Sequence, residues 1–290
     1  AWVLISTSSL CLARLDAARA GMAFAGVGGG IAATGIACLG LAMAQTPSSW
    51  SWLLLAAVSL TALVGAWPLL ATQDDTVPDH DAAAPPDVPA AARHSRAGQR
   101  LLSLCYGLYG LGYILPATYL PAQAHALVTD PALFGLAWPV FGIAAAASTL
   151  LVSSGRLATF SRRGIWGASQ IIMAMGVLLP ILWPTLAAIV VAAVCVGGTF
   201  MVLTMVGMQE ARAAAGLGAQ RLMATMTAAF AIGQLAGPLV VSFLSMWTIH
   251  GLEISMGIAA VALMLSTALL PYVPSSSLPS SSPEKHHERE

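Results

Sequence analysis

Charged residues are scarce in this chain: Asp, Glu, Lys and Arg make up 8% of the 290 residues, and a single lysine is present. The formal net charge is zero, so the chain lacks the basic surface with which proteins bind nucleic acid. Apolar residues make up 58% of the sequence, and the mean hydropathy is +0.80. A soluble domain of this composition would lack the polar surface to cover its core. The composition predicts a protein that is solvated largely by the lipid bilayer.

Sequence motifs of common catalytic sites are also missing. The chain contains no Walker A sequence, no HExxH and no GxSxG, so it offers no support for ATP-driven pumping or for familiar hydrolase chemistry. The four cysteines lie in separate apolar segments and form no CxxC pair, which argues against a disulfide framework and a zinc site. We therefore expect no enzyme activity, no cofactor and no metal.

Nine apolar segments predict transmembrane helices and hence an all-α membrane protein. They cover residues 1–13, 20–44, 51–72, 99–120, 132–152, 163–181, 184–208, 220–246 and 251–272. All but the first are near or above the roughly 20 residues that cross a bilayer. The first segment would reach only about 20 Å as a helix, and it has no charged region of a signal peptide before it. We expect the chain to begin inside a helix.

The basic residues fall only in alternate loops and in the C-terminal tail. They are Arg14, Arg19, Arg93, Arg96, Arg100, Arg156, Arg162, Arg163, Arg212, Arg221, Lys285 and Arg289. Membrane insertion retains cationic loops in the cytoplasm, so this pattern predicts that these loops and the C-terminus are cytoplasmic.

Two segments of different composition divide the chain. Residues 73–98 are rich in Pro, Ala and Asp, and residues 273–290 are rich in Ser, Pro and charge, so both are predicted to be disordered. The linker at 73–98 separates a partial N-terminal half, residues 1–72, from a six-helix half, residues 99–272. Transporters built from two such halves bind substrate between them.

A glycine motif recurs in the second and eighth segments. Gly26 and Gly30 follow the tripeptide AFA in one segment, and Gly233 and Gly237 follow the same tripeptide in the other. A GxxxG pair removes side-chain bulk from one face of a helix, which allows close helix packing. We expect these four glycines to lie at helix contacts.

Four stretches carry a resemblance to a known family: residues 106–121, 135–142, 197–212 and 221–238. They resemble the major facilitator superfamily, and most of all its YbfB/YjiJ-type bacterial branch. The resemblance implies a fold of twelve helices, of which this chain lacks about the first three. It also implies a multi-pass carrier in the bacterial inner membrane.

The loop between the fifth and sixth segments resembles a degenerate copy of a superfamily motif, Gly-x-Leu-Ala-Asp-Arg-x-Gly-Arg-Arg. Gly155, Arg156, Arg162 and Arg163 match it, but Thr159 stands where the motif has its acid. The resemblance implies a gating loop, while anchoring of arginines to lipid headgroups explains the same residues equally well. Glu210 lies close in sequence to Arg212, and we expect these two residues to form an exposed loop pair.

Polar residues deep in the apolar segments are candidates for a substrate cavity. Tyr106, Tyr109 and Tyr113 share one helical face, and Thr204 and Gln234 lie deep in two other segments. Hydroxyl-bearing rings suit a cavity for an aromatic or amphipathic solute. Helix packing is the alternative for the tyrosines, and a hydrogen bond between helices is the alternative for Gln234.

Together these features predict a secondary active transporter of small organic molecules that works by alternating access. Its expected partners are a small-molecule substrate, the lipid bilayer, and protons or another coupling ion, with no nucleic acid. The alternative function is a membrane sensor or scaffold that retains the carrier fold without transporting.

Overall fold

The computed structural model describes residues 17–71, 96–127, 130, 135–157 and 159–273. Almost all of them lie in helices, and the described residues contain no strand. In chain order the helices are α2 (Ala17–Met43), α3 (Ser48–Ala71), α4 (Arg96–Leu127), α6 (Ala137–Ser153), α7 (Arg162–Leu182), α8 (Leu186–Ala215), η3 (Gly216–Gly218), α9 (Ala219–Ser245), α10 (Gly251–Leu269) and η4 (Leu270–Tyr272). The prediction of an all-α membrane protein is confirmed.

Every predicted span from the second onward corresponds to one of these helices. Within the described ranges, seven helices are long and apolar enough to cross a membrane, and α6 is a shorter apolar helix. The helix α4 is longer than predicted: it begins three residues earlier, at Arg96, and it continues through Pro116 and Pro121 to Leu127. The predicted span 1–13 lies outside the described residues, as do most of the linker and most of the tail.

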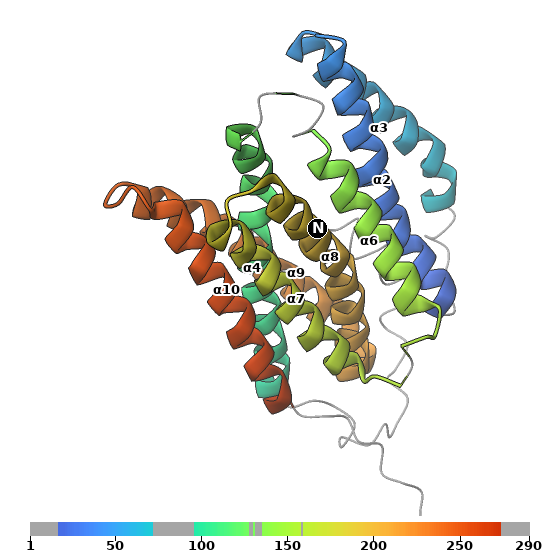
Figure 1. Ribbon diagram of the computed structural model, residues 1–290. Coiled ribbons are helices and arrows are strands. Elements are labelled where there is room, and N and C mark those ends of the chain that lie inside the picture. Colours follow the sequence, from blue (N-terminus) through green and yellow to red (C-terminus); the bar gives the residue numbers. More distant parts are fainter. Residues whose placement is uncertain (1–16, 72–95, 128–129, 131–134, 158, 274–290) are drawn as a thin grey trace, which may run out of the picture.

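The helices form one bundle around α8 (Figure 1). The helix α8 contacts α6, α7, α4 and α9, while α10 packs against α4 and α7. The helix α2 packs along α6, and α4 packs along α9. At the edge of the bundle, α3 has no buried residue between Ser48 and Gly65. The core that positions the deep polar residues is formed by α4, α6, α7, α8, α9 and α10.

Glycines set the closest contact between α4 and α9. An added side-chain carbon at Gly107 would lie 3.2 Å from the carbonyl oxygen of Ala229, and one at Gly233 would lie 2.7 Å from the backbone nitrogen of Leu111. The same carbon at Gly237 would meet Ile114 and Leu115. Gly233 and Gly237 thus lie where α9 faces α4, and backbone packs on backbone there.

The contact between α2 and α6 uses a different glycine from those that we expected. A side-chain carbon at Gly28 would lie 2.8 Å from the carbonyl oxygen of Gly142, whereas carbons at Gly26 and Gly30 would meet no described atom within 4 Å. The prediction for Gly26 and Gly30 is therefore corrected: within the described residues they do not carry a helix contact. Residues two apart on a helix point about 200° apart, so the motif identified the right helix but the wrong face.

A buried hydrogen-bond network joins α4, α7 and α10. The Gln170 side chain donates to the Ser266 hydroxyl at 2.8 Å and accepts from the Thr267 hydroxyl at 3.0 Å. The Ser266 hydroxyl donates in turn to the carbonyl oxygen of Cys105 at 3.0 Å. Gln170 and Ser266 have no exposed surface. This network satisfies polar groups that would be expensive to leave unpaired in the interior.

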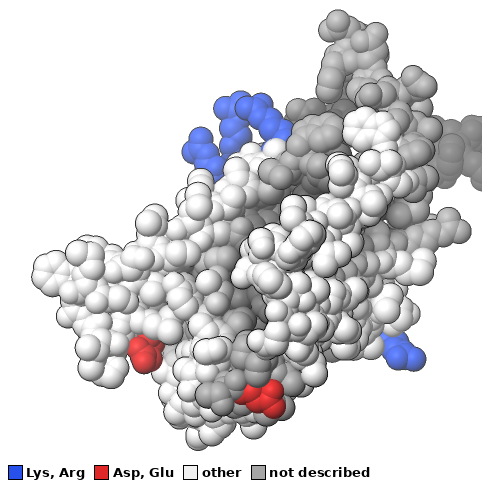
Figure 2. All heavy atoms as spheres, turned by 90° about the horizontal axis from the view of Figure 1, so that it is seen from above, with Lys and Arg blue, Asp and Glu red and all other residues white. Residues whose placement is uncertain are grey.

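The charged side chains lie toward the two ends of the bundle. The arginines whose side chains are described lie at the starts of α4, α7 and α9, at the end of α8, and in the loop after α6. Because successive helices run in opposite directions, these positions share one end, the lower end in Figure 1. Viewed from above, acidic side chains lie on the visible face, and basic side chains show only beyond its edges (Figure 2).

The two glycine environments in α2 make a matched test of helix packing. We expect Gly28→Ala to lower the free energy of unfolding by about 1–3 kcal/mol, the usual cost of overpacking, because the new carbon meets the backbone of α6. Gly26→Ala should be neutral or stabilising, since alanine favours helix by up to about 1 kcal/mol over glycine. Denaturant titration of both variants in mixed micelles measures the difference. Equal effects of the two variants would contradict this assignment of the contact.

Candidate functional site

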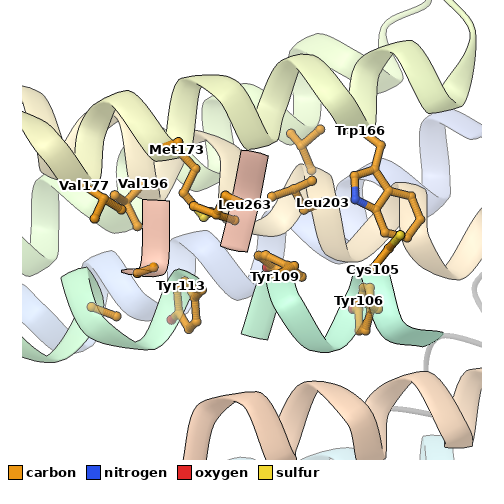
Figure 3. Packing of buried hydrophobic residues seen from close by; sticks show 14 of the residues in the cluster. Cys105, Tyr106, Tyr109, Tyr113, Trp166, Met173, Val177, Val196, Leu203 and Leu263 are labelled. Atoms are coloured by element: carbon orange, nitrogen blue, oxygen red, sulfur yellow. The ribbon is translucent and has the colours of Figure 1, made fainter. Parts of the chain in front are cut away.

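A row of aromatic side chains runs through the middle of the bundle, and α4 supplies its tyrosines. Tyr106, Tyr109 and Tyr113 follow one another along α4, with Trp166 beside Tyr106 (Figure 3). All three tyrosines are buried. The rings of Tyr109 and Phe230 have centroids 5.0 Å apart, and those of Tyr113 and Phe200 are stacked at 4.2 Å. Rings at these distances stabilise each other beyond their burial.

The structure brings together two of the residues that the sequence placed in a cavity. The Tyr109 hydroxyl donates to the carbonyl oxygen of Phe200 at 2.9 Å, and it lies 3.3 Å from the Thr204 hydroxyl oxygen. Thr204 also donates to the carbonyl oxygen of Phe200. These two hydroxyls are therefore engaged within the protein. For the Tyr113 hydroxyl, the described residues provide no hydrogen-bond partner.

Gln234 lies apart from this cluster. It is half-buried on α9, between Gly233 and the exposed Leu235. Within the described residues its amide makes no hydrogen bond to another helix, which was one of the two roles considered for it. The cavity role of Gln234 and of the tyrosines stays a prediction.

A cavity of about 760 Å³ lies between α2, the outer part of α4 and the start of α6. Its lining residues are Val27, Gly30, Ile31, Thr34, Gly35, Cys38, Leu39, Ala42, Pro121, Gly135 and Trp138. None of them is charged, and the polar groups among the side chains are the Thr34 hydroxyl, the Cys38 thiol and the Trp138 indole. The five residues that the sequence assigned to a cavity do not line it.

One signal in the sequence could have found this cavity. Gly30, Thr34, Cys38 and Ala42 recur at every fourth position of α2, so they form a stripe of small side chains along one face of the helix. We interpreted Gly30 only as part of a packing motif, but a stripe of small residues also leaves space. Whether it holds a neighbouring helix or a cavity depends on tertiary structure.

Aromatic rings connect the cavity to the tyrosine row. Trp138, in the cavity wall, lies 5.6 Å from the ring of Phe141, which lies 6.4 Å from the ring of Tyr113. Phe141 is also 6.0 Å from Phe200. The chain of rings therefore extends from Trp138 at the start of α6 to Trp166 near the start of α7.

An ion-pair cluster lies at the opposite, arginine-rich end of the bundle. Glu210 accepts from Arg162 at 2.7 Å and from Arg163 at 3.1 Å, and Arg163 also donates to the carbonyl oxygen of Val273. The cluster joins α8 to the start of α7 and to the end of η4. It supplies a carboxylate for two of the four loop residues that resemble the gating motif.

The expectation of an exposed pair between Glu210 and Arg212 is wrong. Glu210 is 6% exposed and pairs with arginines of another helix. Residues two apart on a helix point to different sides, and α8 continues to Ala215, so these two side chains diverge.

The other two loop residues take no part in the ion-pair cluster. Gly155 has a φ of +77°, which favours glycine, so it makes the turn after α6. Arg156 is exposed and forms no ion pair with a described residue.

As for metals, the described ranges contain no group of three His, Cys, Asp or Glu side chains that could hold an ion.

The two arginines that contact Glu210 differ in exposure, and this difference predicts their contributions. The side chain of Arg163 is 22% exposed, while that of Arg162 is 53% exposed. We expect Arg163→Gln to lower the free energy of unfolding by about 1.5–3 kcal/mol, the range for hydrogen bonds to charged groups. Arg162→Gln should cost less than about 1 kcal/mol, because water screens an exposed pair. A double-mutant cycle with Glu210→Gln measures both couplings, and a larger coupling for Arg162 would refute this ranking.

Comparison with known proteins places these features in one family. Residues 1–271 match the family described as "Uncharacterised MFS-type transporter YbfB". Searches of curated proteins and of solved structures return no match.

Proposed function

Because this chain belongs to the YbfB-type family of the major facilitator superfamily, it is a membrane transporter, and we propose that it carries a small, uncharged, largely apolar organic molecule by alternating access. The observation that carries the proposal is the cavity of about 760 Å³ between α2, α4 and α6. Its volume lies in the usual range for sites that enclose a small organic ligand, roughly 300–1,000 Å³.

The position of the cavity supports a role in transport. The helix α2 precedes residues 73–98, and α4 and α6 follow them, so the cavity is shared by the two predicted halves of the carrier. Substrates of secondary transporters bind at such an interface. The halves themselves, at residues 1–72 and 99–272, are part of the proposal.

The chemistry of the lining supports an uncharged substrate. A charged molecule in an apolar cavity needs a counter-ion or several hydrogen bonds to replace its hydration. The described lining residues supply no charged side chain, but they do supply an indole ring at Trp138 and a hydroxyl group at Thr34. Stacking on Trp138 with one or two hydrogen bonds favours an aromatic or amphipathic molecule.

The contact between α2 and α6 suits helices that must separate and close again. Gly28, Gly142 and Ala146 bring the two backbones together, and the described residues contribute no side-chain hydrogen bond between these helices. Alternating access requires such a contact to open in one of the two states. Because no hydrogen bond between these helices has to break, the free-energy cost of opening the contact is lower.

We also propose that an ion gradient drives transport and that the Arg162–Arg163–Glu210 cluster belongs to a gate. The chain lacks a nucleotide-binding motif, and the cluster is the place where loop residues resembling the gating motif meet a buried carboxylate. Lipid anchoring remains the alternative for the exposed Arg156.

The proposed location is the bacterial inner membrane, with the arginine-rich end in the cytoplasm. Single cysteines at Ser48 and Ala126, in a cysteine-free background, should react with an impermeant thiol reagent added outside the cell. A cysteine at Ser154, in the loop after α6, should react only after the membrane is permeabilised. Labelling of Ser154 alone in intact cells would reverse the proposed orientation.

Counterflow with the full-length transporter in proteoliposomes tests the function itself. We expect a panel of uncharged aromatic compounds to contain one whose accumulation is saturable and is enhanced by an imposed ion gradient. Trp138→Ala should weaken binding of that compound by about 0.5–1.5 kcal/mol, because a stacking partner is lost. Saturable binding without flux under any gradient would favour the sensor or scaffold instead.

The same assay separates the cavity from the tyrosine row. Tyr113→Phe and Gln234→Leu each remove one hydrogen-bonding group, worth about 0.5–1.5 kcal/mol if it contacts substrate. An effect of these two variants with none from Trp138→Ala would move the substrate site to the residues that the sequence favoured.

Cys38 gives an independent readout of the cavity. It lines the cavity and is exposed, whereas Cys105 is buried. With the other three cysteines replaced, N-ethylmaleimide should modify Cys38, and the transported compound should slow the reaction. A cysteine at Gln45, just beyond the end of α2, is the matched control and should react at the same rate with and without the compound. Equal protection at both positions would exclude this cavity as the site.

A further inference from the structure

A second cavity lies at the arginine-rich end of the bundle, far along α4 from the apolar one. It has a volume of about 650 Å³ and lies where α4 and α9 begin and α8 ends. Its polar lining consists of three arginines, Arg96, Arg100 and Arg221, together with Gln99, Ser103 and Thr225. The remaining lining residues are Ala215, Gly218 and Leu222. No acidic residue is among the described lining residues.

The arginines bring like charges together without a described counter-ion. Arg96 and Arg100 are one helical turn apart on α4, a spacing at which like charges repel each other. Arg221 adds a third positive charge from α9. The ion pairs in the described ranges involve Arg162, Arg163 and His250 instead. An anion in the cavity would relieve this repulsion.

We propose that this cavity binds a phosphate-bearing anion at the membrane surface. Guanidinium groups bind phosphate oxygens through pairs of parallel hydrogen bonds, and here they come from two helices. The hydroxyl groups of Ser103 and Thr225 donate to carbonyl oxygens of their own helices. The arginines are therefore the charged donors for the anion. The site requires α4 and α9 to remain side by side, and the glycine contact between them holds them there.

Two sources of phosphate fit the position of the cavity. It lies at the ends of membrane-spanning helices, where lipid headgroups are within reach. In the proposed orientation this end faces the cytoplasmic leaflet, and basic pockets between helices on that side bind anionic headgroups. Free phosphate reaches the same cavity from the water. The site is separate from the proposed transport cavity, so its test does not depend on a transported substrate.

The experiment measures binding to the purified full-length protein with two probes. Native mass spectrometry and titration in nanodiscs of phosphatidylcholine, with and without phosphatidylglycerol, report the lipid. Calorimetry with inorganic phosphate in phosphatidylcholine nanodiscs reports the free anion. The cavity variant is Arg100→Gln with Arg221→Gln. The control, Arg156→Gln with Arg212→Gln, removes the same charge from residues that do not line the cavity.

We expect the cavity variant to bind its probe about thirtyfold more weakly, since each arginine near a phosphate-rich surface contributes about one fivefold step. The control should change binding by less than about threefold. Thr225→Phe, which fills the cavity and retains every arginine, should also abolish binding, so the test does not rest on the arginine variant alone. Loss of phosphatidylglycerol binding identifies the lipid as the source, and loss of phosphate binding without a lipid preference identifies the free anion.

Two results would overturn the proposal. One is that neither probe binds the native protein. In that case, binding that is restored when Asp74, Asp75, Asp79, Asp81 and Asp87 are changed to Asn would show that the chain's own acidic residues occupy the cavity in the native protein. The other is that the control weakens binding as much as the cavity variant, which would show a general charge effect.

Discussion

Close approach of helix backbones is the constraint on which this structure depends. Helices in lipid gain little from burying apolar side chains against one another, since the lipid is as apolar as they are. Contacts must therefore come from dense packing, and glycine gives the shortest distances. Gly107 and Gly233 join α4 to α9, and Gly28 and Gly142 join α2 to α6. The tyrosine row and the two cavities lie on helices that are fixed in this way.

The described bundle separates its functions by depth. One apolar cavity lies toward one end, the aromatic row runs through the middle, and arginines with one buried carboxylate lie toward the other end. This distribution follows from the cost of charge in a bilayer, which falls steeply from the centre to the interfaces. A carrier with such a lining can select by ring shape and hydrogen bonding in its interior. Its ion pairs can lie at the membrane surface, where water and lipid headgroups solvate the charges.

Hydropathy predicted the spans well because it is a property of short stretches of chain. The helices corresponding to 20–44 and 163–181 begin and end within a few residues of the prediction. Resemblance added the family, which the match over residues 1–271 confirms. The tyrosines on α4 share one face, as predicted, for the same local reason, since helical periodicity fixes that face; its burial is seen only in the structure.

The remaining features depend on which helices become neighbours, and sequence distance gives no guide to that. Glu210 was matched with the nearest arginine along the chain, but its partners lie 47 and 48 residues away on α7. Gly26 and Gly28 are two positions apart on one helix, yet only Gly28 meets α6. Gln170 was not singled out at all, because its partners on α10 are equally remote. A motif identifies a helix, and only packing identifies the face that is used.

The contacts of the ion-pair cluster must form in a fixed order, because its members are synthesised at different times. Arg162, Arg163 and Glu210 belong to consecutive helices, so the hairpin of α7 and α8 contains its own neutralising partners as soon as both helices have entered the bilayer. The Val273 carbonyl that Arg163 also binds follows α10 and is translated much later. Insertion of the hairpin therefore does not have to wait for the end of the chain, and the last contact can form only when the final helix is in place.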